Sequence, residues 1–142
     1  MMSSAPASQT ELRIPADPQY IVVAKRAAAG MASVAGLGVE ALEELNIAIA
    51  EACEHTIGVA LAAGLRDARV RIAFDVQEDA LRVDVRLLHS RGEPVPAASG
   101  TRDQREALDL AIHMLRCFAD DVDFQAVGSG LLHVRLAKYR LR

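Results

Sequence analysis

The sequence predicts an α+β fold, a two-layer sandwich in which one mixed, mostly antiparallel sheet is covered on one face by three helices. Two observations lead to this class. The spacing of apolar residues changes between the helical period of 3.6 and the strand period of 2 along the chain. Two pairs of alternating segments are each joined by a short polar or Gly-rich turn, which is typical of antiparallel hairpins. We expect a disordered N-terminal tail over residues 1–10 and a single domain over residues 11–142.

The N-terminal half predicts one strand followed by two helices. A short alternating run from Leu12 to Ile14 predicts an edge strand. Helical spacing predicts a first helix from Tyr20 to Ala35, with Asp17 as its N-cap. A second, longer amphipathic helix is expected from Val39 to Ala62, where Gly64 ends it.

The C-terminal half predicts two hairpins separated by a loop and a third helix. The loop, from His89 to Gln104, has no apolar period, and loops of this length in compact domains are usually functional or mobile. The helix is expected from Arg105 to Ala119. The expected strands cover residues 70–76 and 81–87 in the first hairpin, and residues 122–126 and 132–136 in the second.

Composition and charge exclude several classes of protein. Sixteen Lys and Arg against nineteen Asp and Glu give a net charge of −3, so no overall field attracts nucleic acid or an anionic membrane. No stretch reaches the ~18 apolar residues of a membrane span, and the first ten residues do not form a signal peptide. We therefore expect a cytoplasmic protein. Cys53 and Cys117 lie in apolar segments, which predicts reduced core thiols and no structural disulfide.

The first candidate for chemistry is the pair Glu51 and His55, which lie four residues apart on one face of the long helix. The pair fits a metal site, a nucleotide site, or a solvated surface pair. No second acidic or histidine cluster completes a coordination shell, so we predict no metal site. The other histidines are expected to be structural or exposed, and no Gly-rich phosphate loop is present. The arginines of the first hairpin alternate with aspartates, which predicts a mixed-charge solvated face.

Several phrases of the sequence resemble one family, the bacterial anti-sigma-factor serine kinases, a branch of the histidine kinase-like (GHKL) ATPases. The resemblance runs from Glu11 to Lys138 and is strongest over Leu45-Asn46-Ile47-Ala48-Ile49-Ala50-Glu51-Ala52-Cys53, which looks like the N-box helix of that family. It implies the Bergerat sandwich, with ATP held between the helices and a lid loop. It also implies a protein that binds a sigma factor and phosphorylates a serine of an anti-anti-sigma antagonist.

The family's nucleotide-binding positions are altered in this chain. Glu51 matches the N-box glutamate, the base in the family, but His55 replaces the asparagine that coordinates Mg²⁺, and imidazole suits this hard cation poorly. Ser90-Arg91-Gly92 stands where the family has its adenine-reading DxG box. Ala107-Leu108-Asp109 replaces the GxG box, and the resemblance places the Asp109 charge beside the triphosphate.

We therefore predict a degenerate member that binds partners without phosphotransfer and needs no cofactor. The resemblance implies a sigma factor and an anti-anti-sigma (STAS-type) protein as partners, and a homodimer. The alternative is an active ATP- and Mg-dependent serine kinase, with Glu51 as its base and Ser90 as the adenine acceptor. A small-molecule sensor that reuses the same cleft is a third interpretation.

Overall fold

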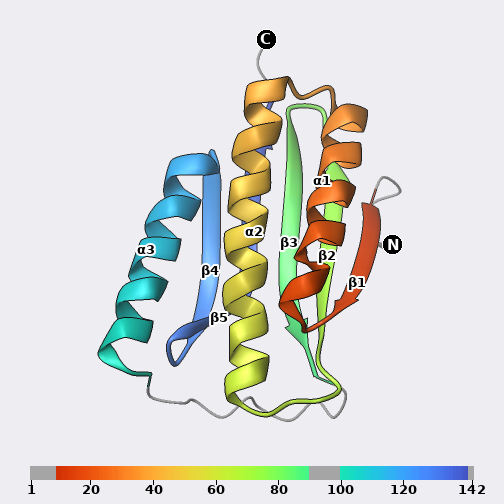
Figure 1. Ribbon diagram of the computed structural model, residues 1–142. Helices are drawn as coiled ribbons and strands as arrows, with labels where there is room; N and C mark the ends of the chain where they lie inside the picture. Colours follow the sequence, from red (N-terminus) through yellow and green to blue (C-terminus); the bar gives the residue numbers. More distant parts are fainter. Residues whose placement is uncertain (1–8, 90–99, 141–142) are drawn as a thin grey trace, which may run out of the picture.

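The computed structural model describes residues 9–89 and 100–140, and its helices and strands follow the predicted order (Figure 1). The elements are β1 (Gln9–Pro15), the 3-10 turn η1 (Pro18–Tyr20), α1 (Ile21–Ala35), α2 (Val39–Ala62), β2 (Arg69–Val76), β3 (Ala80–Leu88), α3 (Arg102–Phe118), β4 (Asp121–Val127) and β5 (Gly130–Tyr139).

One sheet with the strand order β1-β2-β3-β5-β4 forms one layer of the sandwich. Every neighbouring pair within the described part of the chain is antiparallel, so the sheet is less mixed than predicted. The three helices lie side by side on one face of this sheet, with α2 between α1 and α3 (Figure 1). The predicted fold class is confirmed.

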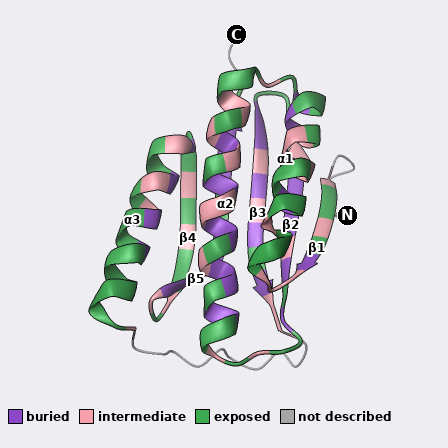
Figure 2. Ribbon diagram, in the orientation of Figure 1, coloured by how far each residue is buried: buried purple, intermediate pink, exposed green. Residues whose placement is uncertain are grey.

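The core lies between α2 and the centre of the sheet. Leu45, Ile49 and Ile57 of α2 are at most 1% exposed and belong to one cluster with Phe74 and Val85 of the central strands. Figure 2 shows buried residues recurring along α2 and along β2 and β3. Among the described helices, α2 alone is long and apolar enough to cross a membrane, but half of that window is buried inside the fold. Its apolarity is therefore that of a core helix.

The structure shifts two predicted boundaries and adds one turn. β1 begins at Gln9, so the last two residues of the predicted tail lie in the strand. Asp17 is an N-cap, as predicted, but it caps η1 and accepts a hydrogen bond from the Gln19 amide at 3.1 Å. α3 begins three residues before the predicted start because Thr101 and Gln104 form a capping box.

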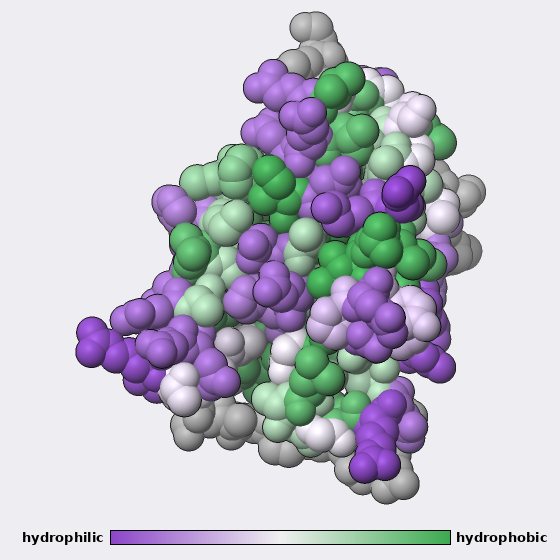
Figure 3. All heavy atoms as spheres, viewed as in Figure 1, coloured by the Kyte–Doolittle hydropathy of each residue, from purple (hydrophilic) through white to green (hydrophobic). Residues whose placement is uncertain are grey.

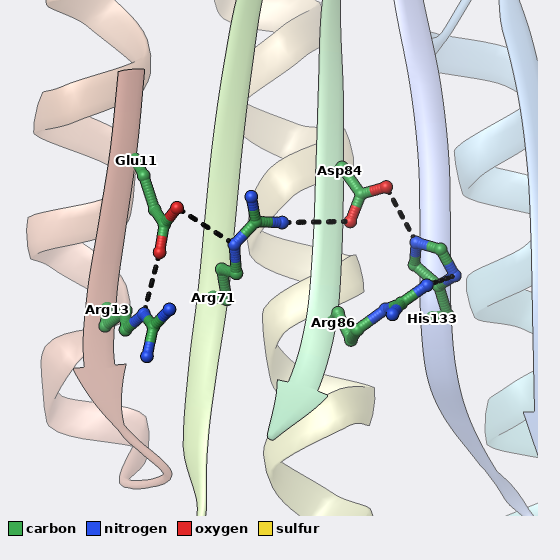
Figure 4. Close-up of polar contacts among 6 residues, drawn as sticks. All are labelled: Glu11, Arg13, Arg71, Asp84, Arg86 and His133. Carbon is green, nitrogen blue, oxygen red and sulfur yellow. Dashed lines mark hydrogen bonds and ion pairs between the residues drawn. The ribbon is translucent and has the colours of Figure 1, made fainter. Parts of the chain in front are cut away.

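The face of the sheet opposite the helices carries a mixed-charge network, as predicted (Figure 4). Glu11 pairs with Arg13 at 2.7 Å and with Arg71 on the neighbouring strand at 3.1 Å. Asp84 Oδ1 lies 4.0 Å from the same Arg71. Asp84 Oδ2 lies 2.7 Å from His133 on β5. Glu11, Arg71, Asp84 and His133 therefore each have a partner on a neighbouring strand, and Arg13 is paired within β1.

The two cysteines differ in environment. Both are free thiols, but Cys53 is buried and Cys117 is exposed. The prediction of a core thiol was wrong for Cys117. The buried stripe of α3 consists of Leu108, Ala111 and Leu115, and a residue two positions beyond Leu115 falls about 200° around the helix, on the solvent side.

Candidate functional site

A groove of about 340 Å³ opens between α2, the first turns of α3 and the β4–β5 turn. Its α2 wall is largely apolar, with Ile57, Val59 and Leu61 among the lining side chains. The polar groups that line it include Glu54, His55, Gln104 and Ser129. It is the groove to which the box resemblance points, because His55 and Ala107 both line it.

Glu51 and His55 lie beside each other at the edge of this groove. His55 Nε2 is 3.6 Å from Glu51 Oε2, and the two side chains are 17% and 21% exposed. His55 lines the groove, whereas Glu51 lies one helical turn away and outside the lining. The predicted pairing on one helix face is confirmed, in a half-buried position and not on an open surface.

Two backbone amides at the start of α3 are hydrogen-bonded to side chains of the helix itself. The Thr101 hydroxyl accepts from the Gln104 amide at 3.2 Å, and the Gln104 side-chain oxygen accepts from the Thr101 amide at 2.9 Å. The first-turn amides of a helix are the ones that can bind an anion, and this box occupies two of them. Asp103 adds a negative charge in the same turn.

Ala107 lies further along α3, in its second turn, where the helix is regular. From the fourth helical residue onward each backbone amide is committed to the carbonyl four residues before it. The amides of Ala107, Leu108 and Asp109 therefore cannot turn toward a phosphate while α3 keeps this form. Asp109 is exposed and does not line the groove, so its charge supplies no argument about a nucleotide.

The DxG-like segment lies outside the described residues. Ser90 and Gly92 fall in residues 90–99, outside the described residues. Their predicted roles stay predictions. His89, the last described residue before them, is half-buried.

The groove has a third wall that the sequence did not predict. It consists of Val127, Ser129 and Gly130 at the β4–β5 turn. A Cβ at Gly130 would collide with Val59 and approach the His55 carbonyl oxygen to 3.1 Å, so β5 passes α2 where only glycine fits. Hairpin signals predicted the turn at Gly128–Gly130, but nothing local to it indicates which helix it contacts.

The donor set of the groove does not match a magnesium–triphosphate site. Mg²⁺ takes octahedral oxygen ligands and is usually held by one or two carboxylates together with the phosphates. Here the position that faces the groove one turn after Glu51 carries an imidazole. Within residues 9–89 and 100–140, no group of three or more His, Cys, Asp or Glu side chains is placed to hold a metal ion.

A second hollow of about 340 Å³ lies on the outer face of the sheet, opposite the helices. Its floor is formed by Ala73 and Ala137, and ion-paired side chains such as Asp123 and Arg135 surround it. Among the described residues that resemble the nucleotide boxes, none lines this hollow, so the groove beside α2 remains the candidate site.

Comparison with known proteins agrees with the fold. A family model described as "Histidine kinase-like ATPase domain" matches residues 14–138. The protein named Serine-protein kinase RsbW of Bacillus velezensis is 30% identical over 139 residues, which cover 91% of this chain and 84% of that protein. The RsbW protein of Bacillus licheniformis is 28% identical over 133 residues, covering 88% and 82%.

A shorter match has a higher sequence identity. The RsbW protein of Listeria innocua is 35% identical over 74 residues, or 52% of this chain, and the match spans about half the length of that relative, 46%. The fold and the family model together define a histidine kinase-like ATPase domain. Within that class, the chain belongs to the RsbW family of anti-sigma-factor serine kinases.

Proposed function

We propose that this protein is a regulator of the anti-sigma type that works by binding protein partners, without nucleotide. The observation that carries the proposal is the position of Ala107, Leu108 and Asp109 inside regular helix, where their amides are already hydrogen-bonded. The capping box at Thr101 and the imidazole of His55 add to it, since both remove groups that a magnesium-bound triphosphate needs.

The partners we propose are a sigma factor and an anti-anti-sigma protein of the STAS type, and the protein acts as a homodimer in the cytoplasm. The family supports these assignments, and the surface is compatible with protein binding. Apolar side chains gather in several places over the helices (Figure 3). Val22, Val34 and Val39 are 52%, 70% and 73% exposed. Side chains of this kind can be buried by a protein partner at little desolvation cost.

Titration calorimetry with Mg-ATP tests the proposal directly. The Bacillus velezensis relative, measured in parallel, is the positive control. At concentrations where that relative gives binding heat, the full chain is expected to give none. Micromolar binding to this chain would overturn the proposal. Capture of partners from the native cytosol, followed by mass spectrometry, then asks whether a sigma factor or a STAS-type protein is bound.

The second candidate function is an active serine kinase, and Glu51 favours it. Its carboxylate is retained one turn from the groove and is only 21% exposed, as a base toward a substrate hydroxyl would be. The test is transfer of labelled phosphate from ATP to an antagonist protein. An active kinase loses transfer in Glu51→Gln and keeps it in the matched variant Glu43→Gln, an exposed position on the same helix. Absence of transfer to every antagonist tested counts against this function.

A further inference from the structure

The outward face of α3 carries two side chains with metal-binding chemistry one helical turn apart. His113 and Cys117 are both exposed, and Cys117 is a free thiol. The Nε2 atom of His113 lies 3.6 Å from the Sγ atom of Cys117. Neither residue lines the groove beside α2, so a role for this pair is independent of the proposed function.

The separation of these two atoms matches one edge of a zinc coordination tetrahedron. Zinc bonds to sulfur at about 2.3 Å and to imidazole nitrogen at about 2.0–2.1 Å, and at a tetrahedral angle these bonds place sulfur and nitrogen about 3.6 Å apart. The α3 backbone holds the two Cβ atoms on one face, so the pair reaches this geometry without refolding. A metal ion bound between the two atoms would take the place of their present contact, and the thiol would lose its proton on binding.

The charged neighbours of the pair on α3 are Arg116 and Asp109. Arg116, the neighbour of Cys117, has its guanidinium carbon 5.7 Å from the centre of the Phe124 ring on β4, so its charge is held against the sheet. Asp109 is exposed one turn before His113 and supplies a negative charge near the same face. A thiolate and an imidazole together bind Zn²⁺ in preference to Mg²⁺ or Ca²⁺.

We propose that His113 and Cys117 form half of a Zn²⁺ site, and that the same pair from a second copy of this chain completes it. Structural zinc sites have four protein ligands, and the described residues offer no third ligand near the pair. A two-fold axis through the α3 face presents the pair twice and gives two sulfur and two nitrogen donors. Two thiolates also cancel the charge of the ion. Leu110, 59% exposed three residues before His113, would be covered by the second α3.

Cobalt(II) titration of the full chain under reducing conditions tests this site, because a thiolate ligand gives Co²⁺ a charge-transfer absorption in the near ultraviolet. We expect that absorption to saturate at one Co²⁺ per two chains and to be reversed by Zn²⁺. Cys117→Ser should abolish it, and His113→Ala should weaken binding by about tenfold or more, since both nitrogen donors of the two-chain site are lost. Both positions are exposed, so the variants should keep the wild-type circular dichroism.

The matched control is Met114→Leu, which changes a neighbouring α3 side chain and leaves both donors in place. Its titration should match the wild type. Cys53 is present in every variant, so any thiolate absorption that remains in Cys117→Ser would come from this buried thiol. The proposal is overturned if wild-type chain gives no thiolate absorption, if Cys117→Ser retains it, or if it saturates at one Co²⁺ per chain. None of these readouts depends on ATP or on a partner protein, so failure here is distinct from failure of the proposed function.

Discussion

His133 and Asp84 are joined across two neighbouring strands of the outer sheet face, with His133 Nε2 2.7 Å from Asp84 Oδ2 (Figure 4). The other ring nitrogen, Nδ1, lies 3.2 Å from Arg86 Nη2. A guanidinium can only donate, so Nδ1 is the acceptor and the ring proton is on Nε2, where it is donated to Asp84. The two neighbours therefore select one neutral tautomer of a histidine that is 8% exposed.

Removal of the Asp84 carboxylate should destabilise the fold. In Asp84→Ala the Nε2 proton of His133 loses its acceptor at a position with little access to water. We expect a loss of about 1–2 kcal/mol in the free energy of unfolding, the cost of an unsatisfied buried donor. Urea unfolding measures it. The matched control is Asp123→Ala on the same face, whose pair with Arg135 is 62–70% exposed and should be worth less than about 1 kcal/mol. Equal losses in the two variants would contradict this explanation.

A second prediction concerns acid stability and Glu11. Its hydrogen bond with Arg13, together with Arg71, lowers the pKa of the Glu11 carboxyl below its ordinary value of 4.5. A carboxyl with a lowered folded-state pKa stabilises the fold above its unfolded-state pKa, and this contribution is lost as the pH falls through the folded-state value. The wild type should therefore exceed Glu11→Gln in urea midpoint at pH 7, and the difference should shrink as the pH falls from 4.5 through the lowered folded-state pKa of Glu11.

How much the sequence predicted depended on the length and strength of each local signal. α2 was predicted to the residue because its apolar period continues for 24 residues. The first turn of α3, Arg102 to Glu106, is wholly polar and has no apolar period, so only the capping pair Thr101 and Gln104 indicates where the helix begins. The predicted start was three residues late for that reason.

The site was predictable only in part for a related reason. Glu51 and His55 share a helix, and their contact follows from spacing alone. The approach of His55 to Ala107 depends on how α3 packs on α2, and the wall at Ser129 depends on the return of the second hairpin to α2. These are contacts between distant parts of the chain, and no local pattern encodes them. The late helix start also concealed that Asp109 is exposed and does not line the groove.

The third prediction uses the different environments of the two thiols. Burial raises the pKa of the Cys53 thiol to about 12, so almost no thiolate forms at pH 8, and the side chain is also closed to reagents. Cys117 is exposed. Iodoacetamide at pH 8 should therefore add one label per native chain, at Cys117, and two labels in urea. Mass spectrometry of the peptides gives the positions. Rapid native labelling of Cys53 would show that α2 is not packed as described.

The last prediction tests how closely β5 approaches α2 at the wall of the groove. A Cβ added at Gly130 would collide with Val59 and lie 3.1 Å from the His55 carbonyl oxygen. Gly130→Ala should therefore cost about 1–3 kcal/mol of unfolding free energy through overpacking. Gly30→Ala is the matched control, since no atom lies within 4 Å of its added Cβ and the residue is inside α1. That substitution should stabilise by about 0.5–1 kcal/mol, because alanine loses less backbone entropy in a helix. Thermal or urea unfolding of both variants gives the change in unfolding free energy, which should be a loss for Gly130→Ala and a gain for Gly30→Ala. A stabilised Gly130→Ala would mean that the hairpin does not pack against α2.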